Sequence, residues 1–102
     1  MDIIKVLSEE LSLREDLLEK TVALLDEGCT VPFIARYRKE VTGGMDDGTL
    51  RNLTERLEYL RNLDARREEV RSLIAAQEKL TPEIEAAIEA AQTMTALDDI
   101  YR

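Results

Sequence analysis

The chain has 102 residues and a formal net charge of −8 at neutral pH, and aromatic residues make up only 4% of it. Its length suits a single domain with one modest core, which must be aliphatic because aromatic side chains are scarce. The abundance of Leu, Glu, Arg and Ala favours helices over strands. The acidity argues against the whole chain serving as a nucleic-acid-binding surface, since phosphate binding depends on clustered cations.

The charge is unevenly distributed along the chain. Residues 1–30 hold three cations against eight anions, residues 31–77 nine against eight, and residues 78–102 two against six. Eight of the nine cations in the middle segment are arginines. An anionic partner is therefore expected to meet the middle of the chain and not its ends.

Cysteine content and hydropathy bear on the cellular compartment. Cys29 is the only cysteine, so no disulfide can form within the chain, and a single free thiol fits a reducing environment. The first residues contain no apolar run of signal-peptide length. No stretch approaches the roughly 20 apolar residues that span a membrane. These observations predict a cytoplasmic protein with no membrane partner.

Apolar spacing and capping residues predict an all-α fold of about six helices. The first covers residues 2–11. Ser12 and Glu15 have the spacing of a capping box, which would open a second helix that ends at Gly28. A short helix is expected over Pro32–Lys39, because proline suits the first helical turn.

A long helix is predicted from about residue 47 to 78, capped by Asp46 or Asp47. No glycine or proline falls between Thr49 and Leu80. The pair Arg66-Arg67 interrupts its apolar seam, so the helix is expected either to bend there or to leave the core for a few residues. The seam consists of Leu50, Leu53, Leu57, Leu60, Leu63, Val70, Leu73 and Ile74.

Two further helices are expected near the end of the sequence. Thr81 followed by Pro82 predicts one helix start, and Thr95 resembles the cap of another. The last helix has fewer than two turns before Arg102, which suggests that the sequence is a fragment of a longer protein.

No combination of residues predicts catalysis, a metal site or a cofactor. The chain has no histidine, which removes the commonest general base and most transition-metal sites. The glycine-rich segment 43–48 lacks the Gly-Lys-Ser/Thr ending of a phosphate-binding loop and contains two aspartates. The adjacent carboxylate pairs diverge by about 100° on a helix, which makes them poor acid–base pairs.

The segment Arg36-Tyr37-Arg38-Lys39 is the candidate binding site, and Arg51 is a further candidate. Arginine offers paired donors to phosphate, and a neighbouring tyrosine ring can stack on a base. On the short helix, Phe33, Ile34 and Tyr37 would form an apolar side and the cations would occupy the rest. The alternative is that these cations form internal ion pairs with the acidic helices of the same domain.

Three stretches of the sequence resemble the Tex family of bacterial transcription accessory proteins, also called YhgF-like proteins. The first and longest is residues 21–44, TVALLDEGCTVPFIARYRKEVTGG. Residues 55–63, ERLEYLRNL, and residues 79–83, KLTPE, match in the same order and spacing. Together they extend the resemblance over most of the chain.

The resemblance implies a long multidomain protein, of which residues 1–102 form one N-terminal helical domain with helix-turn-helix character. Members of the family bind nucleic acid and contain an RNase-H-like domain, helix-hairpin-helix modules and an OB-type RNA-binding domain, which would lie beyond this chain. The expected function is that of a non-enzymatic scaffold domain in a nucleic-acid-binding transcription accessory protein, with the transcription machinery as a further partner. The alternative is a protein-interaction module that recruits a partner through its acidic helices. The preference for RNA or DNA and the oligomeric state stay open.

Overall fold

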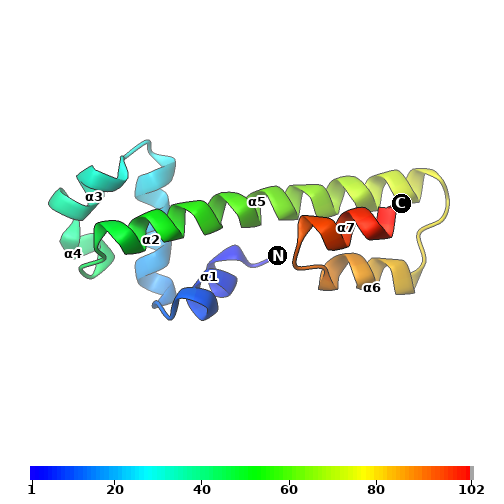
Figure 1. Ribbon diagram of the computed structural model, residues 1–102, viewed down its shortest axis with the longest axis horizontal. Helices are drawn as coiled ribbons and strands as arrows, with labels where there is room; N and C mark the ends of the chain where they lie inside the picture. The colour runs from blue at the N-terminus through cyan, green and yellow to red at the C-terminus, as the bar shows by residue number, and fades with distance from the viewer. Residues whose placement is uncertain (102) are drawn as a thin grey trace. The chain divides into compact units, whose positions relative to one another are not determined.

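The computed structural model describes residues 1–101, and this part of the chain forms seven helices and no strand (Figure 1). The prediction of an all-α fold is confirmed, with one helix more than expected. The predicted long helix is confirmed as the 30-residue α5. The helices are α1 (Ile3–Leu11), α2 (Glu15–Asp26), α3 (Val31–Tyr37), α4 (Lys39–Thr42), α5 (Asp47–Ala76), α6 (Pro82–Ala90) and α7 (Met94–Tyr101).

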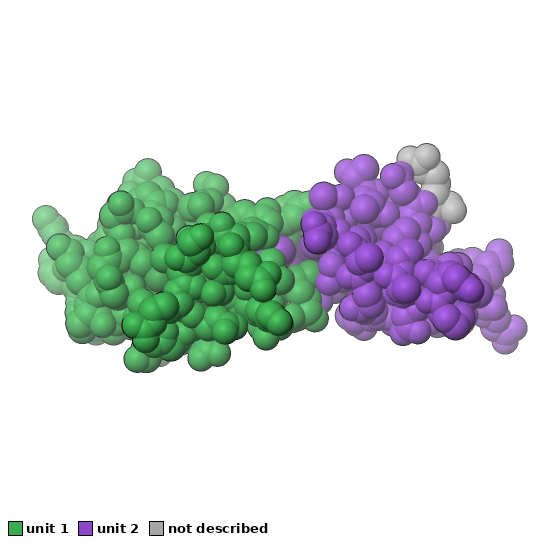
Figure 2. Space-filling view, turned by 90° about the horizontal axis from the view of Figure 1, so that it is seen from below, with its two compact units in different colours: residues 1–59 green, residues 60–102 purple. Residues whose placement is uncertain are grey.

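The helices form two compact units, and Figure 2 colours them separately. The first unit is Met1–Tyr59, and the second begins at Leu60. Helix α5 contributes its first part to one unit and its second part to the other. Within residues 1–101, every helix is too short or too polar to cross a membrane.

The first unit has the aliphatic core that the composition predicts. Helix α2 packs against α1 and α4, and each of the first five helices contributes a buried side chain. A fully buried leucine or isoleucine contributes about 1.5–3 kcal/mol relative to an exposed one. The buried apolar side chains of this unit are Leu7, Leu18, Val22, Ile34, Met45, Leu50, Leu53 and Leu57.

The predicted capping box at Ser12 is wrong. Ser12 ends α1 in the left-handed conformation, with φ 56°, and does not open α2. The N-cap of α2 is Arg14, whose side chain forms no capping hydrogen bond. The turn is instead fixed from the α1 side, where the Ser8 hydroxyl donates to the Leu13 carbonyl at 2.5 Å. Glu15 and Asp16 in the first turn of α2 offset the exposed amides electrostatically.

The short helix predicted over Pro32–Lys39 is two helices in the structure. It begins one residue earlier, at Val31, with Thr30 as its N-cap. Arg38, with φ −128° and ψ 34°, breaks the helical hydrogen-bond pattern between α3 and α4. This break accounts for the count of seven helices.

In the second unit, an arginine completes the apolar seam of α5. Arg67 is 7% exposed, and it stands where the sequence predicted a gap in the seam. Its aliphatic stem lies in the core, and its guanidinium donates to the carbonyl of Ala91, the C-cap residue of α6. The predicted departure from the core at Arg66-Arg67 is therefore wrong, since Arg67 is buried there, and α5 runs through this point as one continuous helix. Leu73, predicted to be in the seam, is 36% exposed.

Two helices begin in the second unit, and the predicted capping residue is confirmed for α6 and wrong for α7. Thr81 caps α6 as predicted, since its hydroxyl accepts from the Ile84 amide at 3.2 Å. The predicted cap at Thr95 is wrong, because Thr95 lies within α7. The Thr93 hydroxyl instead accepts from the Ala96 amide at 3.1 Å.

Candidate nucleic-acid interface

Helix α3 has a well-defined anchor in the first unit. The Thr30 hydroxyl accepts from the Phe33 amide at 3.3 Å and so caps the helix start. Ile34 is fully buried and fixes one face of the helix in the core. The opposite face, with the predicted site residues, is therefore exposed.

The chain after α3 is held by a close approach to α2. Gly43 ends α4 with φ 74°, in the left-handed region that favours glycine. A Cβ at this position would lie 2.7 Å from Cδ1 of Leu17 in α2. The Thr42 side chain, also buried, accepts from the Met45 amide at 3.1 Å. These contacts position α4 and the break at Arg38.

Two exposed aromatic rings and three cations lie together on and just after α3. We refer to Phe33, Arg36, Tyr37, Arg38 and Lys39 as the α3 patch. The two rings contact each other, with centroids 5.3 Å apart and planes tilted by 50°. The Arg38 guanidinium carbon lies 5.7 Å from the Phe33 centroid and that of Arg36 lies 6.0 Å from the Tyr37 centroid. These distances are near the outer limit of a cation–π contact.

The rings of the α3 patch are exposed, which the sequence did not predict. Tyr37 is 58% exposed and Phe33 is 39% exposed. They were expected to form an apolar side of the helix together with Ile34, and in the structure only Ile34 of the three is buried. In a helix of seven residues, hydrophobicity alone could not identify which of the three apolar positions is buried.

The cations of the α3 patch form almost no ion pairs in the described part of the chain. Arg38 lies 4.0 Å from the carboxylate of Glu40, its near neighbour in sequence. Arg36 and Lys39 form no ion pair within residues 1–101. The alternative in which these cations pair with the acidic helices of the same domain therefore does not describe this structure.

Arg51 differs from the other predicted site residues. Its guanidinium forms an ion pair with Asp47, one turn earlier in α5, at 2.7 Å. An exposed pair of this type contributes about 0.3–0.5 kcal/mol to a helix, so a phosphate could replace the carboxylate at small cost. The structure nevertheless does not place Arg51 among the residues of the α3 patch.

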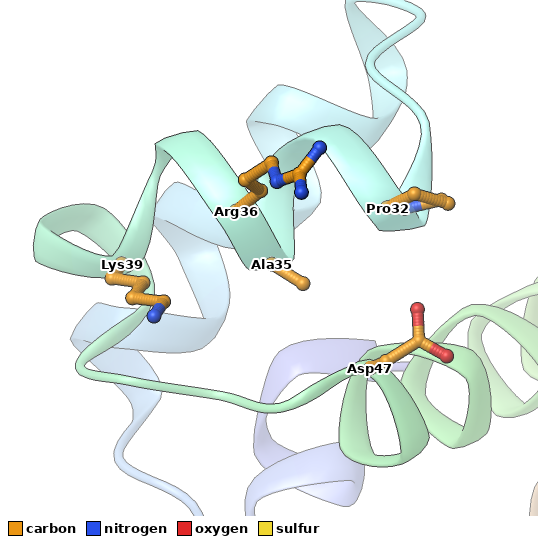
Figure 3. Close-up of a pocket in the computed structure, with 5 residues that line it drawn as sticks. All are labelled: Pro32, Ala35, Arg36, Lys39 and Asp47. Carbon is orange, nitrogen blue, oxygen red and sulfur yellow. The ribbon is translucent and has the colours of Figure 1, made fainter.

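A shallow pocket lies between α3 and the start of α5 (Figure 3). Its volume is about 380 Å³. Pro32 and Ala35 supply its apolar surface, Arg36 and Lys39 supply cations from the α3 side, and Asp47 lies across from them. The pocket therefore shares two cations with the α3 patch and has one carboxylate on its far side.

The arginines farther along α5 are engaged by other groups of their own unit. In the first unit, Arg56 forms a two-point pair with Glu10 of α1, with N–O distances of 2.8 and 2.9 Å. This pairing lowers the pKa of Glu10, chiefly through the hydrogen bond from Arg56, and raises the pKa of Arg56. Arg56 also lies over the Tyr59 ring, 5.1 Å from its centroid.

In the second unit, two further arginines tie α5 to α6 and α7. Arg71 pairs with Glu68 and with the α6 residues Glu85 and Glu89, and the hydrogen bond with Glu68 is the largest cause of its raised pKa. Arg66 pairs with Glu69 at 2.7 Å and lies 3.4 Å from Asp98 of α7. These guanidinium groups are therefore partly neutralised by carboxylates of the same unit.

The arrangement offers binding chemistry through exposed cations and aromatic rings. In the part of the chain that the structure describes, no group of three or more cysteine or carboxylate side chains is placed to hold a metal ion.

Asp46 serves as the cap of α5, because its carboxylate accepts a hydrogen bond from the Thr49 amide at 2.7 Å. Hydrogen bonds from Thr49 also lower the pKa of Asp46. This confirms one of the two aspartates predicted for that cap.

Comparison with known proteins gives a consistent assignment. Residues 1–75 match the family described as the Tex-like protein N-terminal domain. The chain is 52% identical over 101 residues to the transcriptional accessory protein Tex of Neisseria gonorrhoeae, an alignment that covers 99% of this chain and 13% of that protein. It is 50% identical over 97 residues to protein YhgF of Escherichia coli K12, which covers 95% of this chain and 12% of that protein.

A more distant relative occurs in a eukaryote. The S1 RNA-binding domain-containing protein 1 of Pongo abelii is 39% identical over 59 residues, which are 58% of this chain and 6% of that protein. The chain thus spans about an eighth of the length of the two bacterial relatives. The family match covers residues 1–75, and about half of the aligned residues are identical to those of the two bacterial relatives. The chain therefore belongs to the Tex family and contains its N-terminal domain.

Proposed function

We propose that this chain is a non-enzymatic helical scaffold domain of a cytoplasmic, nucleic-acid-binding transcription accessory protein. The names of its relatives support the biological setting, since one is a transcriptional accessory protein and another carries an S1 RNA-binding domain. In this proposal, nucleic acid binds mainly to other parts of the longer protein. Residues 1–102 act as one domain that supports those parts.

The observation that carries the proposal is the pairing of the α5 arginines within their own units. Arg56 is held by Glu10, and Arg71 by three glutamates. Binding of a phosphate by either would have to displace carboxylates that are already in place. On a chain of net charge −8, this leaves little cationic surface with which to hold a long polyanion.

The proposal is tested by deletion in a full-length relative. The domain that corresponds to this chain is removed from Tex of Neisseria gonorrhoeae, and the affinity for RNA is compared with that of the intact protein at equal salt. A scaffold domain predicts a change in affinity of less than about tenfold, or 1.4 kcal/mol, together with a loss of thermal stability or of function in transcription. A loss of affinity of a hundredfold or more would overturn the proposal.

One observation favours the alternative function, recruitment of a protein partner through acidic helices. Glu15 and Glu19 of α2 are exposed and form no ion pair within residues 1–101. Replacement of both by lysine is expected to weaken binding to purified RNA polymerase if the machinery of transcription is the partner. Unchanged binding to the polymerase would exclude this face of α2 as the contact.

A further inference from the structure

The α3 patch combines features that the rest of the described chain lacks. It places two exposed aromatic rings beside three cations, and residues 31–39 contain no acidic residue. Among residues 1–101, the one ion pair that it forms is the 4.0 Å contact between Arg38 and Glu40. Aromatic side chains and arginine are typical of binding surfaces in general, so the kind of partner has to be decided by the shape and charge of the patch.

We propose that the α3 patch binds a short stretch of single-stranded nucleic acid, with bases stacked on Phe33 and Tyr37 and phosphates contacted by Arg36 and Lys39. This proposal extends the proposed function. It rests on one part of that function, namely that the longer protein acts on nucleic acid. It adds a small auxiliary contact to the main binding sites elsewhere. Arg38 contributes the third cation.

The shape of the patch favours unstacked bases over an apolar peptide. Peptide anchors need enclosed apolar pockets, whereas the pocket beside this patch is shallow and has apolar surface only from Pro32 and Ala35. Ring faces that are open to solvent can instead stack on any base. The guanidinium groups of Arg36 and Arg38, which lie over the Tyr37 and Phe33 rings, can extend the stack, since arginine planes also stack on bases.

The charge of the chain favours a short single strand over a duplex. A duplex is rigid and would bring many phosphates close to a protein of net charge −8. It also hides the faces of its bases, on which stacking depends. A flexible single strand can contact α3 alone, and two to three neutralised phosphates give a salt dependence with a slope of about −1.4 to −2.1.

The test is a titration of the 102-residue chain, labelled with ¹⁵N, with a short single-stranded RNA of mixed sequence at about 50 mM salt. The same titration is made with single-stranded DNA, duplex DNA and a short polyglutamate peptide. We expect amide shifts centred on residues 31–39 with a single strand and weaker shifts with the duplex. The RNA and DNA arms decide which nucleic acid binds more tightly.

Two double variants separate stacking from charge, and a third variant serves as the control. The double variant Phe33→Ala/Tyr37→Ala is expected to weaken binding at least about fivefold, the minimum for loss of one stacked base, while the salt slope stays the same. The double variant Arg36→Gln/Lys39→Gln is expected to reduce the slope by about 1.4. Lys20→Gln is the control for loss of a positive charge, because Lys20 lies exposed on α2, outside the α3 patch, and it is expected to leave both affinity and slope unchanged.

Several results would overturn the proposal while the scaffold function stands. The first is the absence of shifts at residues 31–39 with any oligonucleotide. The second is a double aromatic variant that folds, as its own amide spectrum would show, and binds as tightly as the unaltered chain. If polyglutamate binds the patch at least as tightly as the oligonucleotides do, the site is one for acidic peptides.

Discussion

Arg67 is a charged residue in the aliphatic core of the second unit, at the position where the sequence predicted a gap in the apolar seam. Its side chain is 7% exposed in the core of the second unit, and its guanidinium reaches the Ala91 carbonyl at the end of α6. A cation at that end offsets the helix dipole and an otherwise unpaired carbonyl. Its Nε has no hydrogen-bond partner among residues 1–101. Arg67 therefore stabilises the unit both by packing and by capping.

Two substitutions separate these contributions. Arg67→Met keeps most of the buried volume and loses the hydrogen bond, so we expect the free energy of unfolding to fall by about 1 kcal/mol. Arg67→Ala also leaves a cavity and is expected to cost about 2–4 kcal/mol. Urea denaturation followed by circular dichroism measures both values. Equal costs for the two variants would show that packing by the Arg67 stem contributes nothing.

A single residue at the end of α5 offers a stabilising change. Glu78 has φ 58° in the turn that closes this helix, where Lys79 donates to the Ile74 carbonyl at 3.2 Å. Glycine is usual at such a position because a side chain there costs about 1–2 kcal/mol. After the greater entropy of glycine in the unfolded chain is subtracted, Glu78→Gly should raise the free energy of unfolding by about 0.5–1 kcal/mol. A lower midpoint in urea would contradict this reading of the turn.

At the scale of elements, the pair between Glu10 and Arg56 joins α1 to α5 within the first unit. Its hydrogen bonds lower the pKa of Glu10. A carboxylate with a depressed pKa in the folded state contributes stability above its unfolded pKa, and that contribution is lost as the pH falls through the folded pKa. Both side chains are 34% exposed, so water screens the pair and we expect it to contribute less than about 1 kcal/mol.

The pH dependence of Glu10→Gln tests this pair. The unaltered chain should be more stable than the variant by a constant amount above about pH 5, and the difference should shrink below about pH 4. Other carboxylates affect both proteins equally and cancel in the comparison. Glu9→Gln is the control, since Glu9 is exposed and forms no ion pair among the described residues. A difference that does not change with pH would mean that the pair contributes nothing.

The elements themselves were largely predictable from apolar spacing, but their ends were only partly so. Thr81 and Asp46 cap helices as predicted, because each directly precedes a helix start. Ser12 and Thr95 have equally suitable side chains, yet one ends a helix and the other lies inside one. A capping pattern describes only local hydrogen bonding. The packing of neighbouring helices, which the pattern does not contain, decides where each helix begins.

At the scale of the whole molecule, the candidate site was predictable in its cations and not in its aromatic rings. The charge distribution identified the middle of the chain, which contains nine of its fourteen cations. It could not show that Arg56, Arg66 and Arg71 pair with carboxylates distant in sequence. Nor could it show that Phe33 and Tyr37 lie exposed beside Arg36. Both features depend on tertiary contacts.

The central claim is that the α3 patch is the cluster of cations in residues 31–77 that is available to an anionic partner, because Arg51, Arg56, Arg66 and Arg71 of α5 are paired with carboxylates. It is tested most directly by the association constant of the 102-residue chain for duplex DNA, measured as a function of salt. Each phosphate neutralised contributes about −0.9 to the slope of log K against log salt, so three available cations predict weak binding with a slope no steeper than about −2.7. A slope of about −5 or steeper would require the α5 arginines to leave their carboxylates, and would contradict the claim.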